Sequence, residues 1–407
     1  MKIPFSPPYI DDDVINEVTD SLKSGWITSG PKVKALEELT AEFSSLKYVA
    51  CVNSWTSGAQ LVLKWFGVGP GDEVIVPAYT YAATALVVLH CGAKPVMVDV
   101  LEDFTIDPEK VKKAITSKTK VIFAVDFAGY PCNYDVLNEI ISNQDIKEKF
   151  SPSNTIQSKM NSILLVSDAA HSIGAKYKDS PAAIFSDITI YSFHAVKNVT
   201  TAEGGAICLN LPSQFDNETE YKWLKLNSLN GQTKDAFTKS QAGGWKYDII
   251  SQGLKVNMPD ICAAIGLAQL RKYKDKLLVE RKQIFDSYAN AFSKCEWALT
   301  PPSITEKKSS SFHLFALRIK GITESQRDAI IDEITKSEIT VNVHFIPLPM
   351  LTLFKELGYS INDFPQAYEN YSQEISLPIY PQLTSEQVGL IIDSVTKAVE
   401  KVITASI

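Results

Sequence analysis

A chain of 407 residues has room for two domains and a large core, and a formal net charge of −7 gives no basic surface for nucleic acid. No apolar run is long enough to span a bilayer, and Met1 to Pro4 lead directly into polar sequence without a signal-peptide core. The six cysteines have no close paired spacing, which is typical of free thiols in a reducing compartment, and the five histidines are not in metal-ligand register. We therefore expect a cytoplasmic protein without a metal site that binds neither nucleic acid nor membrane.

A polar turn at 53–57 leads into an apolar-rich helical pattern that continues to Phe66. The amides of a helix start, with the hydroxyls of Thr56 and Ser57 beside them, favour a phosphate dianion through hydrogen bonds and the helix dipole. The same residues also fit an ordinary helix cap. The turn is therefore a candidate phosphate site that needs support from other segments.

The next segments alternate between strands and polar connections. A tight turn at 69–73 precedes a strand at 74–76, and Tyr81 then offers an aromatic ring for either a ligand face or the core. The segment 142–161 is rich in Ser, Asn, Gln and Lys, which predicts a solvated excursion with a short helix at 146–150.

An apolar run at 163–166 predicts a buried strand that leads to Asp168 and then to small residues and His171. A carboxylate there can reach a buried heteroaromatic nitrogen. If the ligand is pyridoxal phosphate, that contact keeps the ring protonated and makes it an electron sink. Asp168 also fits an N-cap, and His171 fits either a partner of the cofactor's phenolic oxygen or a residue packed under the strand ends.

A second buried strand, at 188–191, would deliver Ser192, His194 and Lys197 into a cleft, and a glycine-rich return at 201–205 follows. Burial disfavours the ammonium form of a lysine, and the neutral amine can condense with an aldehyde. Lys197 is therefore a candidate Schiff-base nucleophile, although most lysines in turns are surface residues without a chemical role.

Strand and helix patterns alternate from about residue 15 to 260, which predicts a doubly wound α/β domain with a mostly parallel sheet. We expect an N-terminal arm at 1–14, a large cofactor-binding domain at 15–259 and a smaller α+β domain at 260–407. A long helical pattern begins the smaller domain, followed by expected strands and a final amphipathic helix. The expected strands cover 312–319 and 340–345, and the final helix covers 385–403.

Several motifs in one order resemble the DegT/DnrJ/EryC1/StrS family of sugar aminotransferases, which depend on pyridoxal 5′-phosphate (PLP) and have fold type I, the aspartate-aminotransferase-like architecture. The resemblance covers almost the whole chain, with its peak at 192–205. The other matching segments are 24–31, 69–74, 167–174, 253–260, 313–315 and 377–381.

The resemblance implies a role for each matching residue. It implies that Lys197 forms the Schiff base with PLP and that Asp168 pairs with the pyridinium nitrogen. It implies that His171 lies near the phenolic oxygen, that Tyr81 stacks on the ring, and that three hydroxyl residues hold the phosphate. These three are Thr56, Ser57 and Ser192. Asn257 is similar to an asparagine that reaches the phosphate from a neighbouring subunit, which implies a homodimer with shared active sites.

Three positions depart from the family pattern. Trp55 stands where a small residue is usual, and Asp126 and Asn230 replace frequent histidines. We expect Asp126 and Asn230 to lie in loops on the substrate side, so the identity of the sugar stays open.

The resemblance implies transamination from L-glutamate, with pyridoxamine 5′-phosphate as the intermediate cofactor form, to a keto-deoxysugar carried on a nucleoside diphosphate. The product would serve a surface polysaccharide or a glycosylated metabolite. The alternatives are a sugar dehydratase that uses the same cofactor and a regulatory relative without activity. Lys197 disfavours the dehydratase, where the resemblance predicts histidine. The chain has four arginines, which are Arg271, Arg281, Arg318 and Arg327, and the sequence does not choose among them, lysines and backbone amides for the donor carboxylate.

Overall fold

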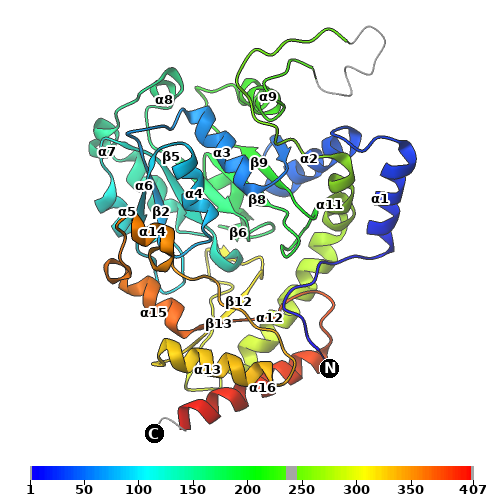
Figure 1. Ribbon diagram of the computed structural model, residues 1–407, viewed down its shortest axis with the longest axis vertical. Coiled ribbons are helices and arrows are strands. Elements are labelled where there is room, and N and C mark those ends of the chain that lie inside the picture. The colour runs from blue at the N-terminus through cyan, green and yellow to red at the C-terminus, as the bar shows by residue number, and fades with distance from the viewer. Residues whose placement is uncertain (1, 235–244, 405–407) are drawn as a thin grey trace.

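The computed structural model describes residues 2–234 and 245–404, and a seven-stranded sheet forms the centre of its larger part (Figure 1). The strand order is β1-β9-β8-β5-β4-β2-β3, and only β9 runs antiparallel to its neighbours. The strands are β1 (Tyr48–Val52), β2 (Glu73–Pro77), β3 (Lys94–Val98), β4 (Thr119–Val125), β5 (Leu164–Ala169), β8 (Ile188–Ser192) and β9 (Gly205–Leu209). The predicted α/β class with a mostly parallel sheet is confirmed.

Helices cover both faces of this sheet, which is why its strands are apolar on both sides. Along β1, Val49 and Cys51 pack with α2 and α11 on one face, while Ala50 and Val52 pack with α3 on the other. The helices of this part are α1 (Asp12–Ser24), α2 (Pro31–Ser44), α3 (Trp55–Phe66), α4 (Ala83–His90), α5 (Pro108–Ala114), α6 (Tyr134–Ser142), α7 (Gln144–Lys149), α8 (Thr155–Met160), α9 (Asn217–Asn227) and α11 (Asp260–Lys272), with 3₁₀ turns η1 (Phe127–Gly129) and η2 (Ala182–Phe185).

A second apolar cluster forms the smaller part around a three-stranded sheet of order β10-β12-β13. Its elements are the π-helical turn η3 (Tyr273–Leu277), α12 (Leu278–Phe292), β10 (Ala298–Leu299), β12 (Phe315–Ile319), α13 (Glu324–Thr335), η4 (Leu348–Met350), α14 (Thr352–Glu356), η5 (Ile361–Asp363), α15 (Pro365–Gln373), β13 (Glu374–Leu377) and α16 (Ser385–Thr404). A third small sheet joins β6 (Lys176–Tyr177), β7 (Ser180–Pro181) and β11 (Lys308–Ser309). α11 packs on α1 and α2 of the larger part, whereas the second cluster takes its helical residues from Ile284 onward. The predicted domain boundary at residue 260 therefore stays a proposal.

The N-terminal segment belongs to both parts. Ile3 is buried in the second cluster, where its N–H donates to Glu338 O across 2.9 Å. The chain then passes the cavity between the two parts before α1 begins at Asp12. None of the helices in the described ranges is long and apolar enough to cross a bilayer.

Two local predictions have different outcomes. The segment 142–161 contains the expected short helix as α7 and a second helix, α8, and most of its residues are exposed, as expected of a solvated segment. Ile146 and Met160 join the main core, and Gln157 is fully buried. The predicted strand at 340–345 is wrong, since only an isolated bridge between Asn342 and Ser376 forms there. That segment runs along the cavity instead of along a sheet.

Candidate active site

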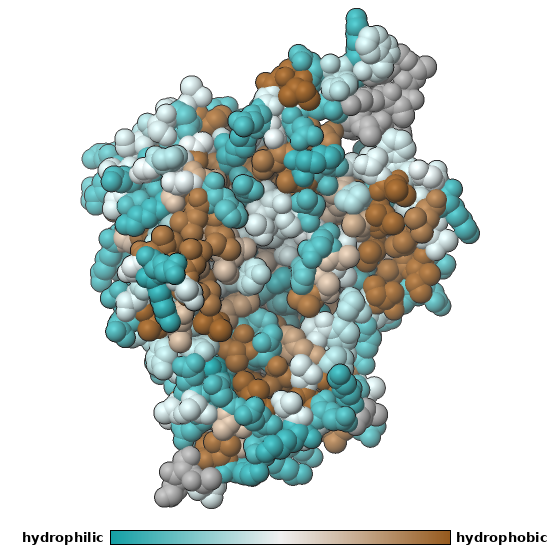
Figure 2. Space-filling model, in the orientation of Figure 1, coloured by the Kyte–Doolittle hydropathy of each residue, from teal (hydrophilic) through white to brown (hydrophobic). Residues whose placement is uncertain are grey.

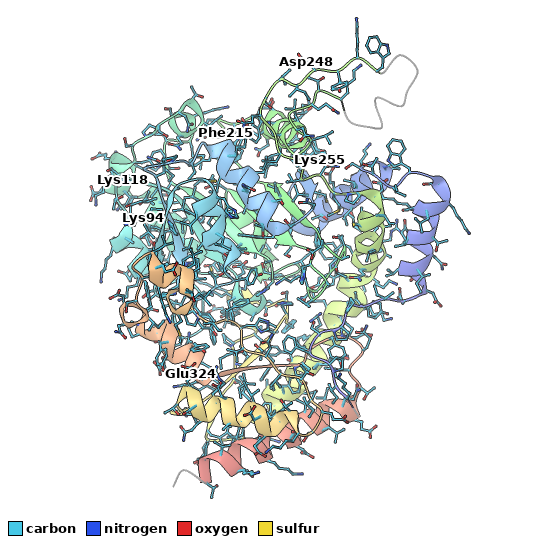
Figure 3. All side chains as sticks on the ribbon, viewed as in Figure 1. Lys94, Lys118, Phe215, Asp248, Lys255 and Glu324 are labelled. Atoms are coloured by element: carbon cyan, nitrogen blue, oxygen red, sulfur yellow. The ribbon has the colours of Figure 1, made fainter. Side chains whose placement is uncertain are left out.

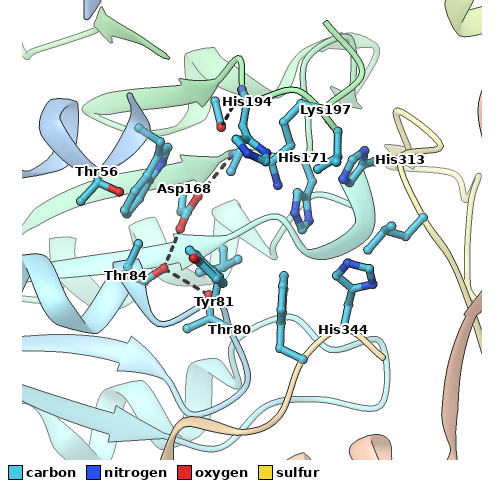
Figure 4. A pocket seen from close by; sticks show the side chains of 18 of the residues that line it. Thr56, Thr80, Tyr81, Thr84, Asp168, His171, His194, Lys197, His313 and His344 are labelled. Atoms are coloured by element: carbon cyan, nitrogen blue, oxygen red, sulfur yellow. Dashed lines mark hydrogen bonds between the residues drawn. The ribbon is translucent and has the colours of Figure 1, made fainter. Parts of the chain in front are cut away.

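A cavity of about 530 Å³ lies where β5 and β8 end and α3 begins. Its size is within the range of small-molecule sites. The other wall comes from the N-terminal segment, from 313–314 and from 342–345, so both parts of the molecule enclose it. Figure 4 shows Thr56 and His344 toward opposite ends of the cavity, with Asp168 and His171 between them. The parallel strands thus deliver polar side chains to one edge of the sheet.

Lys197 lies in this cavity on the loop that follows β8. Its backbone N–H donates to His194 O across 2.9 Å, which closes a turn between the strand end and the lysine. Burial lowers the pKa of the Lys197 amine from its ordinary value near 10.5 to about 8, and the nearby Asp168 opposes that shift. About a tenth of the amine is therefore neutral at pH 7, far more than for an ordinary lysine, and able to attack an aldehyde.

Asp168 is the second titratable group of the cavity and is 4% exposed near the end of β5. Burial raises the pKa of its carboxyl to about 7. The Thr84 hydroxyl donates to Asp168 Oδ2 across 2.9 Å, and the Ala170 N–H donates to Oδ1 across 3.3 Å; both contacts lower the pKa. Thr84 in turn shares a hydrogen bond of 3.2 Å with Thr80, so a short chain of hydroxyls holds the carboxyl.

His171 is buried beside Asp168 and has a defined tautomer. The Ala128 N–H donates to His171 Nδ1 across 3.2 Å, so the ring carries its proton on Nε2. Burial holds the pKa of His171 well below its usual value, which keeps the imidazole neutral. Its ring lies 4.3 Å from that of His313. His171 therefore offers a neutral N–H donor to a ligand.

The predicted phosphate turn is only partly open to the cavity. Thr56 and Ser192 line it, but Ser57 does not: the Ser57 N–H and hydroxyl both bond Ser54 Oγ, at 3.0 and 2.9 Å. Ser57 thus completes the helix cap, while the earlier amides of the first turn have no partner within the helix. The turn therefore contains both the helix cap and the candidate phosphate site that the sequence allowed.

The first residue of β9 shapes the floor of this turn. An added Cβ on Gly205 would lie 2.8 Å from Trp55 N and 2.8 Å from Tyr191 O, closer than real contacts. Only glycine therefore lets the backbone of β9 approach the start of α3 this closely. This close approach fixes the start of α3, where Ser54, Trp55 and Thr56 line the cavity, beside the end of β8.

Tyr81 and Asn257 lie differently from the buried groups. Tyr81 lines the cavity but remains 64% exposed, with its ring 5.9 Å from that of Phe345. Asn257 does not line the cavity of its own chain, and its amide donates to Ser29 Oγ across 2.6 Å. A contact from Asn257 to a cofactor would thus need a second chain.

Several cavity residues were not predicted. They are Phe5, Ser6, Thr80, Thr84, His313, His344 and Phe345, whereas His194 lines the cavity as predicted. Four of the five histidines of the sequence line this one cavity. Their spread over more than 170 positions hid the cluster, because only the fold brings the loops of both parts together. Among the described residues, no three His, Cys, Asp or Glu side chains are arranged to hold a metal ion.

The residues that depart from the family pattern have different surroundings. Asp126 is 1% exposed, does not line the cavity and accepts hydrogen bonds from Cys132 N–H and the Tyr134 and Ser172 hydroxyls. The expectation of a substrate-side position is therefore wrong for Asp126, which ties buried loops together. Asn230 adopts a positive φ of 59° and also lies outside the cavity lining, whereas Trp55 lines it.

All four arginines are engaged away from the cavity lining. Arg271 pairs with Glu17, Arg281 donates to Ile379 O, and Arg318 donates to Asn370. Arg327 donates to two backbone carbonyls and pairs with Asp328. The sequence did not show which residue binds the carboxylate of the amino donor. In this arrangement no arginine of the same chain lies at the cavity to bind it.

The arrangement fits a flat pyridine aldehyde that carries a phosphate. An amine of lowered pKa, a buried carboxyl and a neutral imidazole donor line the cavity together with the start of α3 at Thr56. These groups supply an attacking amine, a partner for a ring nitrogen and a phosphate seat within one enclosed space.

Comparison with known proteins gives consistent results. The model of the DegT/DnrJ/EryC1/StrS aminotransferase family matches residues 8–148 and 153–396. The unmatched residues 149–152 begin at the end of α7 and precede α8.

Individual relatives cover nearly the whole chain. The spore coat polysaccharide biosynthesis protein SpsC of Bacillus subtilis is 34% identical over 98% of this chain and 97% of its own length. A UDP-4-amino-4-deoxy-L-arabinose–oxoglutarate aminotransferase of Shewanella sediminis is 30% identical over 98% of both chains. Spr1654 of Streptococcus pneumoniae, a sugar aminotransferase by its assigned name, has a solved structure in the pyridoxamine phosphate form. It is 43% identical, covers 100% of both chains and has a TM-score of 0.94. Its PLP form has a TM-score of 0.93.

Proposed function

Because the chain belongs to the DegT/DnrJ/EryC1/StrS aminotransferase family, we propose that it transfers the amino group of L-glutamate to a keto-deoxysugar carried on a nucleoside diphosphate. The family assignment makes the protein a PLP-dependent sugar aminotransferase of fold type I. The proposal adds the amino donor, the nucleotide and the roles of individual residues.

The observation that carries the proposal is the lowered pKa of Lys197 inside the cavity that also holds Asp168. When bound, PLP supplies an aldehyde for covalent capture of amines and a ring that accepts electrons from the adjacent carbon. Lys197 Nζ holds the aldehyde in the resting enzyme. Asp168 would hold the ring nitrogen, and the raised pKa of this carboxyl would let the pair share a proton inside a low-dielectric site.

The other predicted residues orient the cofactor. Thr56 and Ser192 bind the phosphate with the amides of the α3 start, while Ser57 holds the turn in shape. His171 donates its Nε2 proton to the phenolic oxygen. Tyr81, which lines the cavity and is largely exposed, would stack on the ring.

Lys197 also moves the proton during transfer. Once the donor's nitrogen has replaced it, its freed Nζ would move a proton from the donor Cα to the C4′ atom of the cofactor, and in the second half-reaction from C4′ to the sugar carbon that receives the amine. A pKa near 8 lies much closer to neutral pH than that of an ordinary lysine, so the group can both accept and return a proton.

The proposed amino donor and the proposed sugar acceptor are inferred from the names of the relatives. The Shewanella protein is named for a UDP-sugar and for oxoglutarate, the keto acid that corresponds to glutamate. SpsC is named for polysaccharide biosynthesis. These names support an amino sugar made on a nucleotide for a surface polysaccharide or a glycosylated metabolite.

A homodimer completes the proposed site. The segment near Asp248 projects beyond α9 and returns at Lys255, just before Asn257 (Figure 3). Its apolar side chains are open to solvent in the single chain, with Trp245 72% and Ile250 61% exposed. Figure 2 also shows apolar surface on the side where α1 lies. Burial of these surfaces against a second copy would stabilise a dimer and bring Asn257 to the partner's phosphate site.

The thiols support the proposed cytoplasmic location. All six cysteines are free, and Cys51, Cys132 and Cys208 are buried, as expected where thiols stay reduced.

The test uses the absorption of the bound cofactor. The protein loaded with PLP should show a visible band that bleaches on addition of L-glutamate and returns when a keto-sugar nucleotide is added. Lys197→Ala should bind PLP without that band and lose turnover by about 10³-fold or more. Lys34→Ala, at an exposed lysine on α2, is the control and should behave as the wild type. A band that glutamate leaves unchanged would contradict the proposed donor, and near-normal turnover of Lys197→Ala would remove Lys197 from the reaction.

A further inference from the structure

A chain of hydrogen bonds links the cavity residue His344 to a buried carboxyl. His344 Nδ1 lies 2.9 Å from Ser376 Oγ, and Ser376 Oγ shares a short hydrogen bond with Glu374 Oε1. The other carboxyl oxygen, Oε2, accepts the backbone N–H of His344 across 3.0 Å. The imidazole is thus connected to Glu374 through one hydroxyl. The Nε2 atom of His344 takes no part in this series of hydrogen bonds.

The fold explains this alignment. Glu374 and Ser376 are alternate residues of β13, so both side chains lie on the same face of the strand, and both are fully buried. The bridge between Asn342 and Ser376 brings the segment before His344 alongside β13. Tyr79 adds a second anchor, since its hydroxyl donates to His344 O across 2.5 Å.

The series of hydrogen bonds from His344 through Ser376 to Glu374 has only two consistent proton arrangements. A serine hydroxyl has one proton, so it donates to one neighbour and accepts from the other. If Glu374 is ionised, Ser376 donates to Oε1 and His344 must carry its proton on Nδ1. If Glu374 is protonated, its Oε1–H donates to Ser376, Ser376 donates to His344 Nδ1, and the imidazole proton lies on Nε2.

Burial favours the protonated carboxyl. No lysine, arginine or histidine of the described chain forms an ion pair with the Glu374 carboxyl, because Arg327 donates to the backbone carbonyl of Glu374 instead. The other titratable groups nearby are phenols, at Tyr79 and Tyr371, and they add no positive charge at neutral pH. Burial raises the pKa of Glu374 to about 8, against the smaller opposing effects of its hydrogen bonds and of Arg327. The second arrangement therefore dominates at neutral pH.

The consequence is a second neutral N–H donor in the cavity beside that of His171. Burial lowers the pKa of His344 to about 3, and the charge of Lys197 adds to the effect, so the imidazole stays neutral next to the reacting amine. The amino donor must place its Cα at Lys197, and its carboxylate is one bond away. All four arginines are engaged elsewhere, so other groups must meet that carboxylate.

We propose that His344 Nε2–H binds the carboxylate of the amino donor and that Glu374 and Ser376 are positioning residues that hold this tautomer. This inference rests on the proposed transamination, since the carboxylate belongs to its donor. A neutral imidazole binds the donor carboxylate here in place of an arginine. The buried Glu374 carboxyl fixes the imidazole tautomer through the proton that it donates, not through a negative charge.

The first test measures the half-reaction with glutamate by the bleaching of the PLP band. His344→Ala should raise the glutamate concentration at half-maximal rate by about 10- to 100-fold, the usual range for a hydrogen bond to a charged group. Ser376→Ala and Glu374→Leu should raise it by about three- to tenfold, because the imidazole keeps its place but loses its fixed tautomer. The half-reaction with the keto-sugar nucleotide should change less in each variant.

Glu374→Gln is the matched variant. Its amide N–H donates to Ser376 Oγ and its carbonyl accepts the His344 N–H, which copies the protonated carboxyl but not the ionised one. It should restore glutamate affinity relative to Glu374→Leu. A loss in Glu374→Gln as large as that in Glu374→Leu would overturn the role assigned to the carboxyl proton.

The second test needs neither activity nor cofactor. In apo protein labelled with ¹⁵N-histidine, the His344 resonances, assigned by their loss in His344→Gln, should show a proton on Nε2 and a bare Nδ1 at neutral pH. Ser376→Ala should mix the two tautomers, and Glu374→Gln should keep the wild-type pattern. A proton on Nδ1 in the wild type would overturn the inference even if transamination proceeds. Absence of any glutamate half-reaction in the wild type would instead contradict the proposed function. An effect confined to the keto-sugar half-reaction would place His344 at the sugar and overturn its assignment to the carboxylate.

Discussion

The Thr84 hydroxyl donates a 2.9 Å hydrogen bond to Asp168 Oδ2, which joins the first turn of α4 to the carboxyl at the end of β5. Asp168 is buried, so this bond is one of the few contacts that favour its ionised form. The strength with which Asp168 holds a positive ring nitrogen thus depends on a residue that no motif indicated.

Thr84→Val should weaken this support without removing the carboxyl. Loss of the hydrogen bond raises the pKa of Asp168 further above about 7 and should lower kcat by about tenfold, within the range of a bond to a charged group. Asp168→Asn should give a larger loss, and Thr84→Ser should keep near-normal kcat. Single-turnover rates with glutamate measure the effect. Equal rates for Thr84→Val and the wild type would show that the hydroxyl is dispensable.

The pKa of Lys197 predicts how cofactor loading depends on pH. Only the neutral amine attacks the aldehyde, so the loading rate should rise about tenfold per pH unit below pH 8 and level off above it. A lysine of ordinary pKa would give a rate that keeps rising toward pH 10.5. Stopped-flow absorbance of apo protein mixed with PLP measures this profile, with PLP's own ionisation corrected by a model amine.

The same shift has a consequence for stability. The unfolded chain keeps its Lys197 proton up to about pH 10.5, whereas the folded apo protein loses it near pH 8, so unfolding free energy should rise with pH between these values. At pH 7 the buried ammonium is costly, and Lys197→Met should stabilise the apo protein by about 3 kcal/mol. Urea unfolding of both proteins at pH 7 and pH 9.5 checks the sign; a less stable Lys197→Met at pH 7 would contradict the burial argument.

The sequence predicted the parts of the site that follow directly from strand ends. Lys197, Asp168 and Ser192 come after apolar runs, and parallel strands bring such positions to one edge of a sheet. The phosphate turn was found from its hydroxyls, but the distinction between Thr56, which lines the cavity, and Ser57, which caps α3, depends on side-chain directions that spacing does not give.

The opposite wall could not be predicted in the same way. His313 and His344 come from loops of the smaller part, and their distance from Lys197 depends on how the two apolar clusters pack. The alternating pattern at 340–345 suggested a strand because its apolar residues meet the cavity wall and the N-terminal segment, where Phe5 stacks on His344 at 5.4 Å. A loop whose side chains are buried against a cavity can therefore show the same pattern of apolar residues as a strand buried in a sheet.

The glycine at the start of β9 allows a direct test of the phosphate seat. Gly205→Ala would force its methyl group to within 2.8 Å of Trp55 N and Tyr191 O, both of them backbone atoms that cannot move independently. We expect PLP affinity to fall by at least about tenfold and the protein to lose about 2 kcal/mol of stability. Gly69→Ala is the control, because no atom lies within 4 Å of its added Cβ. Dialysis of the loaded proteins followed by absorbance measures retention, and equal retention by both variants would remove Gly205 from the phosphate seat.

The extra segment between α6 and β5 should stabilise α3 without affecting chemistry. Gln157 is fully buried, and its amide donates to Phe66 O at the end of α3 across 3.0 Å, while its Oε1 accepts the Ser153 N–H across 2.9 Å. Gln157→Leu leaves the Ser153 N–H without its acceptor and should lower the unfolding free energy by about 2 kcal/mol. Gln144→Ala, at an exposed position on α7, should change it by less than about 0.5 kcal/mol. Since α3 carries Thr56 at its other end, the glutamate half-reaction of folded Gln157→Leu should match the wild type. A selective loss of that half-reaction would instead couple this segment to the phosphate turn.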